Sequence, residues 1–254
     1  MSASSQPAIP PTALQWLLTA QDGSIKSATR LLALGRTAAP VAGALDANVR
    51  LVACDTSRAG VRALLHRARH ALPVVAQPSQ LPFAPGSFDV VAVHQSLHTL
   101  PEGSLASIAR VLAPGGHLAV SYIVRDDSVP WVRRLGDLLR DVDPAAMAGA
   151  YGTDSVERLT TSRFFTDVAE RRHRLWAPIS RVNLLDMVAR RFPDLDADRL
   201  GQLMHAVGHL YETSARVPEP LLLPYQVSSW KAVVDPVEAA SALDDPDPGL
   251  PIRL

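Results

Sequence analysis

Several features that usually mark a function are scarce in this sequence. It holds one cysteine, Cys54, in 254 residues, which excludes an intramolecular disulfide and a cysteine-based zinc cluster. Basic and acidic residues number 25 each, so the positive surface typical of nucleic-acid binders is not expected. No apolar run approaches the length of a membrane span, and no basic-then-apolar leader is found. We therefore expect a cytoplasmic protein that binds neither nucleic acid nor a membrane.

Glycine is scarce at the place where it would be most informative. Residues 30–55, RLLALGRTAAPVAGALDANVRLVACD, predict a strand, a tight turn, a helix and a second strand. Gly35 and Asp55 are 55 − 35 = 20 residues apart, the spacing between a nucleotide-binding loop and the carboxylate that holds a ribose. Such loops usually carry three glycines, and this one has only Gly35. The spacing indicates a nucleotide site with an unusual loop.

The pattern of the first half predicts an α/β fold with a Rossmann-like, doubly wound sheet. Short apolar segments alternate with helical ones, and FDVVAVH at 88–94 is apolar almost throughout, as in a parallel strand covered on both faces. Ligands in such sheets bind beyond the carboxyl ends of the strands. We therefore expect one cleft to be bordered by Gly35, Asp55, Gln77, the segment 94–98 and the segment 122–127.

The predicted domain organisation is a single domain between two flexible tails. Residues 1–11 and 235–254 have tail-like composition, and 12–234 form the domain. Within it, 24–128 is a nucleotide-binding core, 129–220 is a helical cap inserted near the C-terminus, and 221–234 is the last strand. The cap is expected because amphipathic helices there lie between two strand-like segments.

Three sequence blocks carry a resemblance to a known family. They are LPFAPGSFDVVAVHQSLHTLP at 81–101, IARVLAPGGHLAV at 108–120 and VRDDSVPWV at 124–132. Together they resemble bacterial class I S-adenosylmethionine-dependent methyltransferases, and SRVNLLDMVARR and LLLPYQVSSWKA resemble an actinobacterial-looking branch. The resemblance covers roughly residues 24 to 234. It implies a seven-stranded sheet with an antiparallel last strand, and S-adenosylmethionine as cofactor.

The resemblance also assigns roles to single positions. The family's first loop is Asp-x-Gly-x-Gly-x-Gly. Here Ala33 replaces the acid, Gly35 keeps the first glycine, and Thr37 and Ala39 replace the other two. A left-handed Thr37 would cost roughly 1–2 kcal/mol, and the absence of a charged hydrogen-bond acceptor at Ala33 would cost about 1.5–3 kcal/mol. Together these amount to roughly two to four decades of affinity. S-adenosylmethionine is the expected cofactor, and the altered loop leaves open whether its binding is weakened or lost.

The cofactor site implied by the resemblance combines this loop with residues after three further strands. Asp55 would hold the ribose, although it could equally cap the next helix. Gln77 stands where an aspartate usually meets the adenine amino group, and its oxygen can accept the same hydrogen bond. The full set of predicted cofactor-binding residues is Gly35, Arg36, Thr37, Asp55, Thr56, Gln77 and Gln95.

The candidate for chemistry is His98, as a general base for an acceptor that must lose a proton. The substrate and cap candidates are His94, Arg125, Trp131 and Tyr151. Each has a plainer alternative: a polar residue at a helix entry, a salt-bridged loop, or an aromatic residue in the core. His205 and His209 have metal-ligand spacing, but no third ligand is evident, so no metal site is predicted.

Two functions remain open at the sequence level. The first is an S-adenosylmethionine-dependent methyltransferase that acts on a small molecule. The second is a catalytically impaired relative that serves as a binding or partner subunit, because Ala33, Thr37 and Ala39 alter the donor loop. A dinucleotide enzyme is less favoured, since its motif would need glycine at 37 and 40. A homodimer is compatible with either function.

Overall fold

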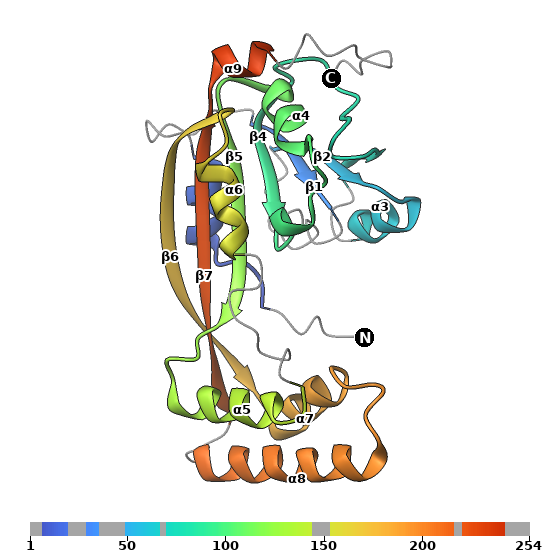
Figure 1. The fold of residues 1–254 in the computed structure, drawn as a ribbon, viewed down its shortest axis with the longest axis vertical. Coiled ribbons are helices and arrows are strands. Elements are labelled where there is room, and N and C mark those ends of the chain that lie inside the picture. Colours follow the sequence, from blue (N-terminus) through green and yellow to red (C-terminus); the bar gives the residue numbers. More distant parts are fainter. Residues whose placement is uncertain are drawn as a thin grey trace. The chain divides into compact units, whose positions relative to one another are not determined.

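Seven strands form one sheet in the order β3-β2-β1-β4-β5-β7-β6. The structure, a computed structural model, describes residues 7–19, 29–35, 49–66, 70–143, 153–215 and 220–241. The pairs β3–β2, β2–β1, β1–β4 and β4–β5 are parallel, and β7 runs opposite to its neighbours (Figure 1). This confirms the predicted Rossmann-like sheet and its antiparallel last strand. The strands are β1 (Arg30–Leu34), β2 (Arg50–Asp55), β3 (Leu72–Val75), β4 (Phe88–His94), β5 (Leu112–Arg125), β6 (Phe165–Ile179) and β7 (Leu221–Val234).

Several of the helices begin where the sequence provides a cap or a proline. Pro11 and Pro130 occupy first turns, and Ser57, Ser180 and Asp196 each accept a bond from the backbone N–H three residues on. The predicted helix near 40–45 lies outside the described residues, and the expected tail at 235–254 opens with a short helix. The helices are α1 (Pro11–Leu18), α3 (Arg58–Leu65), η2 (Leu97–Thr99), α4 (Ser104–Val111), α5 (Pro130–Arg140), η3 (Thr153–Val156), α6 (Glu157–Thr160), α7 (Arg181–Ala189), α8 (Ala197–Ser214) and α9 (Pro236–Ser241).

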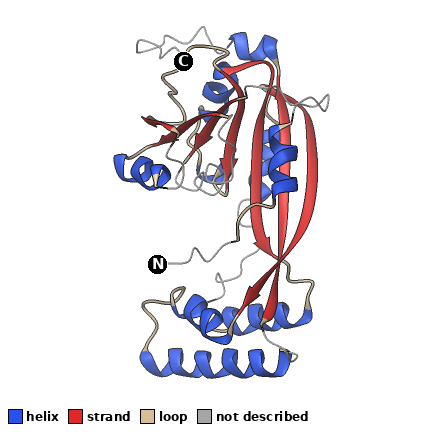
Figure 2. Ribbon diagram, turned by 180° about the vertical axis from the view of Figure 1, so that it is seen from behind, coloured by secondary structure: helices blue, strands red, loops and turns tan. Residues whose placement is uncertain are grey.

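The chain divides into two compact units. The sheet unit comprises Ala8–Tyr122, Gly152–His173 and Val227–Leu254, and the helical unit comprises Met1–Pro7, Ile123–Tyr151 and Arg174–Gln226. The three long strands β5, β6 and β7 pass from one unit into the other (Figure 2). In the helical unit, α8 packs against α5 and α7. These three helices lie in the region predicted as a cap.

Strand β1 is the centre of the parallel part of the sheet. Leu34 at its end is in register with Cys54 of β2 on one side and Val93 of β4 on the other. The chain runs outward from β1 to β2 and β3, and then returns to the other side as β4. Neighbouring strands that leave in opposite directions define a topological switch point, where open α/β sheets bind ligands. The carboxyl ends of β1, β2 and β4 therefore border one another.

The block that carries the family resemblance is held by arginines. Arg110 of α4 donates to the carbonyl oxygens of Leu81 and Phe83, at 2.5 and 2.7 Å. Arg30 of β1 donates to both carboxylate oxygens of Asp89, with the ion pair at 2.9 Å. Charge-assisted bonds of this kind are about twice as strong as neutral ones. Arg110 therefore fixes the loop before β4, and Asp89 ties β4 to β1 through Arg30.

The C-terminus of α1 is held by the buried side chains of His117 and Lys231. The Nε2–H of His117 donates to the carbonyl of Leu17 at 2.6 Å, and the ammonium of Lys231 donates to that of Thr19 at 2.8 Å. Lys231 also lies 4.7 Å from the centre of the Trp16 ring, which is cation–π geometry. Burial lowers the pKa of both Lys231 and His117. These bonds satisfy carbonyls that a helix end leaves without an intrahelical partner.

His94 is a buried, neutral histidine inside β4. His94 is 1% exposed, and its Nδ1 lies 2.9 Å from Oγ of Ser121 on the neighbouring strand β5. Burial lowers the pKa of His94 to about 4. The ring therefore stays uncharged in the folded protein near neutral pH, and it takes part in the packing between the two strands.

His94 should make the protein acid-sensitive. An unfolded histidine has a pKa of about 6.5, so between that pH and about 4 the unfolded chain binds a proton that folded His94 does not. The free energy of unfolding should therefore fall with decreasing pH, by up to about 1.4 kcal/mol per pH unit from this group. Chemical denaturation across this range should show a shallower slope for His94→Gln. An equally steep slope in His94→Gln would contradict this role of His94.

Candidate functional site

The turn after β1 needs a glycine at its first position. Gly35 has φ = 79°, a left-handed conformation that L-residues with a side chain adopt at a cost. Its N–H donates to the carbonyl of Cys54 at 2.9 Å, which ties the turn to the end of β2. A Cβ at Gly35 would lie 3.4 Å from Oγ of Ser96. The next two predicted site residues, Arg36 and Thr37, lie outside the described residues.

Asp55 ends β2 and is 3% exposed. Its Oδ1 accepts from the backbone N–H and the hydroxyl of Ser57, at 2.9 and 3.0 Å, and Ser57 in turn caps α3. A Cβ at Gly60 would lie 2.1 Å from this oxygen, so the glycine makes room for the carboxylate. Both hydrogen bonds that described residues give to this side chain end on Oδ1. The second oxygen is thus the one that a ribose hydroxyl could reach.

The residues expected on the adenine side follow β3 and β2. Val75 of β3 is in register with Asp55, and the N–H of Ala76 donates to the Asp55 carbonyl at 3.1 Å. Gln77 comes next, exposed, in a turn closed by a bond from the N–H of Gln80. Thr56 is also exposed. Gln77 and Thr56 therefore stand at the same edge of the sheet as Asp55.

The end of β4 holds a strained residue and an unsatisfied hydroxyl. Gln95 has φ = 58°, a conformation that non-glycine residues rarely adopt and that clusters at functional sites. Its N–H donates to the carbonyl of Ser121 at 2.8 Å. Oγ of Ser96 is buried and has no hydrogen-bond partner among the described residues. A buried hydroxyl without a partner is costly, and this one lies beside Gly35.

His98 is an exposed residue on the 3₁₀ turn η2, after β4. Its backbone N–H and its Nδ1 lie 3.3 and 3.2 Å from the hydroxyl of Tyr122. The turn is also held by Arg158 of α6, which donates to the carbonyls of Leu97 and Leu100 at 3.3 Å. His98 is thus presented on a short turn whose polar backbone groups are bound on two sides.

The structure therefore brings most of the predicted cofactor and catalytic residues to one edge. Gly35, Asp55, Gln77, Gln95 and His98 follow the ends of β1, β2, β3 and β4 in the sheet unit. Sequence reasoning did not single out Ser96, Tyr122 or Arg158 as functional. Only the first two had a signal, their place within the segments expected at the cleft.

The substrate and cap candidates are distributed differently. His94 is buried in β4, as described above. Arg125 and Trp131 are half-buried residues of the helical unit. Burial raises the pKa of Tyr225, and nearby Arg125 opposes that rise. Tyr151 lies outside the described residues. A substrate role for these four residues stays a prediction.

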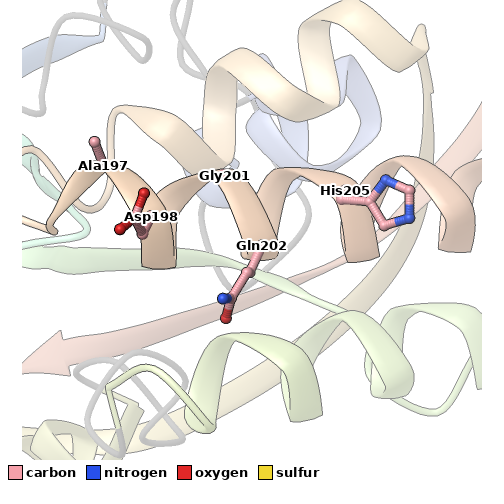
Figure 3. Close-up of a pocket in the computed structure, with 5 residues that line it drawn as sticks. All are labelled: Ala197, Asp198, Gly201, Gln202 and His205. Atoms are coloured by element: carbon pink, nitrogen blue, oxygen red, sulfur yellow. The ribbon is translucent and has the colours of Figure 1, made fainter.

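An open pocket with a volume of about 590 Å³ lies along one helix of the helical unit. Figure 3 shows the residues of α8 that line it, including Asp198, Gln202 and His205. His205 and His209 are both exposed. No group of three or more His, Cys, Asp or Glu side chains that could hold a metal ion occurs among the described residues. Within the same residues, no helix is long and apolar enough to cross a membrane.

Comparisons with known proteins connect this geometry to a family. The sequence profile of a methyltransferase domain matches residues 32–120. An uncharacterized methyltransferase from Mycobacterium tuberculosis is 32% identical over 195 residues, which are 73% of this chain and 71% of the relative. One from Schizosaccharomyces pombe is 27% identical over 209 residues, 77% of this chain and 82% of the relative.

Solved structures agree in fold. A candidate type II methyltransferase from Anaeromyxobacter dehalogenans has a TM-score of 0.59 at 20% identity, covering 90% of this chain and 96% of that one. A candidate methyltransferase from Bacillus halodurans has a TM-score of 0.53 at 16% identity, covering 87% and 98%. At these identities the likeness shows the fold, and the mycobacterial relative shows the family. The chain belongs to the class I S-adenosylmethionine-dependent methyltransferase superfamily.

Proposed function

We propose that the protein binds S-adenosylmethionine and transfers its methyl group to a nucleophilic atom of a small molecule. The observation that carries the proposal is the pairing of Gly35 and Asp55 at the ends of adjacent strands. Gly35 turns with a positive φ, and both hydrogen bonds that described residues give to the Asp55 carboxylate end on Oδ1. A tight turn next to a buried carboxylate is the arrangement that holds a nucleoside in α/β sheets.

The described residues fit the adenosine end of this cofactor. Asp55 would accept from the ribose, and Gln77 at the adjoining edge would accept from the adenine amino group. The fit at the methionine end rests on Ser96, whose hydroxyl, beside Gly35 and unsatisfied by any described residue, could bond a polar group of the ligand. Ala33, which replaces the family's acid, is 0% exposed within β1, so it offers no polar contact there.

The chemistry asked of the protein is modest. When bound, S-adenosylmethionine supplies an electrophilic methyl group on a sulfonium. The residues of the chain must then orient the acceptor in line with it. Where the acceptor must lose a proton, His98 would take it, because His98 is exposed at this edge and an imidazole nitrogen can accept a proton. A small-molecule acceptor is favoured over a nucleic acid by the balanced charge of 25 basic and 25 acidic residues.

The first test separates the ligand role of Asp55 from its capping role. Asp55→Asn should weaken binding of the demethylated cofactor, S-adenosylhomocysteine, about 10- to 150-fold in isothermal titration calorimetry. That is the effect of losing a charged hydrogen-bond acceptor, about 1.5–3 kcal/mol. Ser57→Ala removes the cap and both side-chain bonds of Ser57 but keeps the carboxylate. It should lower the free energy of unfolding by about 1 kcal/mol and leave affinity within a few-fold of wild type.

Wild-type protein that binds neither cofactor form at millimolar concentration would contradict the proposed function. Binding without methyl transfer to any acceptor in an extract would instead favour the non-catalytic binding role that the altered loop raised.

The second test uses two glycines with the same backbone conformation. Gly35 has φ = 79° and Gly115, at the start of β5, has φ = 75°. Alanine at either position should lower the free energy of unfolding by about 1–2 kcal/mol. Only Gly35→Ala should weaken binding of S-adenosylhomocysteine, because a Cβ at Gly115 meets no atom of the described residues within 4 Å. Equal affinity in both variants, measured by calorimetry, would place the turn after β1 outside the cofactor site.

A further inference from the structure

The hydroxyl of Tyr122 is a junction of three polar groups in the sheet unit. Tyr122 lies on β5 and is 0% exposed. Its oxygen lies 3.3 Å from the backbone nitrogen of His98, 3.2 Å from Nδ1 of the same residue, and 3.1 Å from Oγ of Ser155 on η3. The ring is held against Trp230 of β7 in an edge-to-face contact, with ring centres 6.2 Å apart. The hydroxyl is therefore fixed in place by its surroundings.

Counting protons at this hydroxyl leaves two arrangements. A tyrosine hydroxyl has one proton to donate and two lone pairs to accept with, and the backbone N–H of His98 uses one lone pair. In one arrangement Nδ1–H of His98 donates to Tyr122, and Tyr122 donates to Ser155. In the other, Ser155 donates to Tyr122, and Tyr122 donates to Nδ1. The two differ in the free nitrogen of His98: Nε2 has a lone pair in the first and a proton in the second.

We propose that Tyr122 is the positioning residue of the first arrangement, which holds His98 with Nδ1 protonated and Nε2 ready to accept a proton. The assignment rests on the proposed function, because only this tautomer lets exposed His98 act as a base. The backbone N–H and the side chain of His98 then both donate to one oxygen, which fixes the ring relative to its own turn. Arg158 fixes the same turn through the carbonyls of Leu97 and Leu100.

The proton path in the reaction follows from this arrangement. With S-adenosylmethionine bound, the lone pair of the acceptor atom would form the new bond to the methyl carbon, and the electron pair of the broken carbon–sulfur bond would stay on sulfur. The proton of the acceptor moves to Nε2 of His98, which becomes an imidazolium and later returns the proton to water. Nδ1–H donates to Tyr122 before and after the transfer, so no hydrogen bond has to be exchanged during the step.

The test is the tautomer of His98 in the full-length protein labelled with ¹⁵N-histidine. Long-range ¹H–¹⁵N NMR, at a pH well above the ordinary histidine pKa of about 6.5, distinguishes a protonated ring nitrogen from an unprotonated one. The His98→Gln variant assigns the signals. In the wild type, Nε2 of His98 should resonate in the far-downfield region of unprotonated nitrogens. A wild-type Nε2 in the protonated region would overturn the proposal.

Ser155→Ala sharpens the test without touching His98. With its acceptor removed, the Tyr122 proton should turn to Nδ1, and the Nε2 signal should move upfield towards the protonated region. Tyr122→Phe keeps the buried ring and should produce the same direction of shift. Tyr211→Phe is the matched control, since it removes the hydroxyl of another fully buried tyrosine, bonded to Ile179, and should leave the His98 signals unchanged. An unmoved Nε2 signal in Ser155→Ala would also contradict the proposal.

A failure of this proposal can be distinguished from a failure of the proposed function on which it rests. The NMR measurement needs neither cofactor nor acceptor. Failure to bind S-adenosylhomocysteine would therefore remove the methyl-transfer function and leave the tautomer result standing. Conversely, a protonated Nε2 together with intact cofactor binding would remove the role of Tyr122 and leave the donor site in place.

Discussion

Pairing on both sides of β1 is the constraint on which the site depends. Because β1 is bonded to β2 on one side and to β4 on the other, three strands that are separate in sequence must end at one edge. Gly35 follows β1 at that edge, Asp55 is the last residue of β2, and the segment that begins at Gln95 follows β4. The N–H of Gly35 donates to the carbonyl of Cys54, so the turn and the carboxylate are set by the same ladder. Any change that shifted the register of β1 would therefore move Gly35 relative to both Asp55 and the segment after β4.

The fold and the placement of Gly35 and Asp55 at one edge of the sheet were predictable because their signals are local. Uninterrupted apolar residues in β4 predict a strand covered on both faces, and the spacing from Gly35 to Asp55 is counted along the chain. The surroundings of His98 had no such signal. Tyr122 is 24 residues from His98, and Arg158 is 58 residues from Leu100. Contacts at such separations depend on how strands and turns pack, which no periodicity reveals. For His94, neighbouring apolar residues were the better guide to its burial than its own polarity.

The residues that identify the family and those that would do its chemistry are largely different. Arg110 fastens the Leu81–Phe83 loop, and Arg30 pairs with Asp89, so this recognisable block serves the architecture. Asp55 is where the two roles meet, since one of its oxygens bonds Ser57 at the start of α3. A chain can therefore keep the family's packing while its loop at 36–39 changes. This explains how a sequence can be assigned to the superfamily although its glycine motif retains a single glycine.

The hydrogen bonds from His117 and Lys231 to the end of α1 imply an order of events during synthesis. The carbonyl of Thr19 accepts a hydrogen bond from the ammonium of Lys231, which is 212 residues further along the chain. The carbonyl of Leu17 accepts one from His117, which is 100 residues further along. A growing chain on the ribosome carries this helix long before either donor has emerged. Until Lys231 has emerged, the Thr19 carbonyl lacks this donor and is left to water. The hydrogen bond from Lys231 is therefore added to the helix end only when β7 is complete, and a chain released before that strand would lack it.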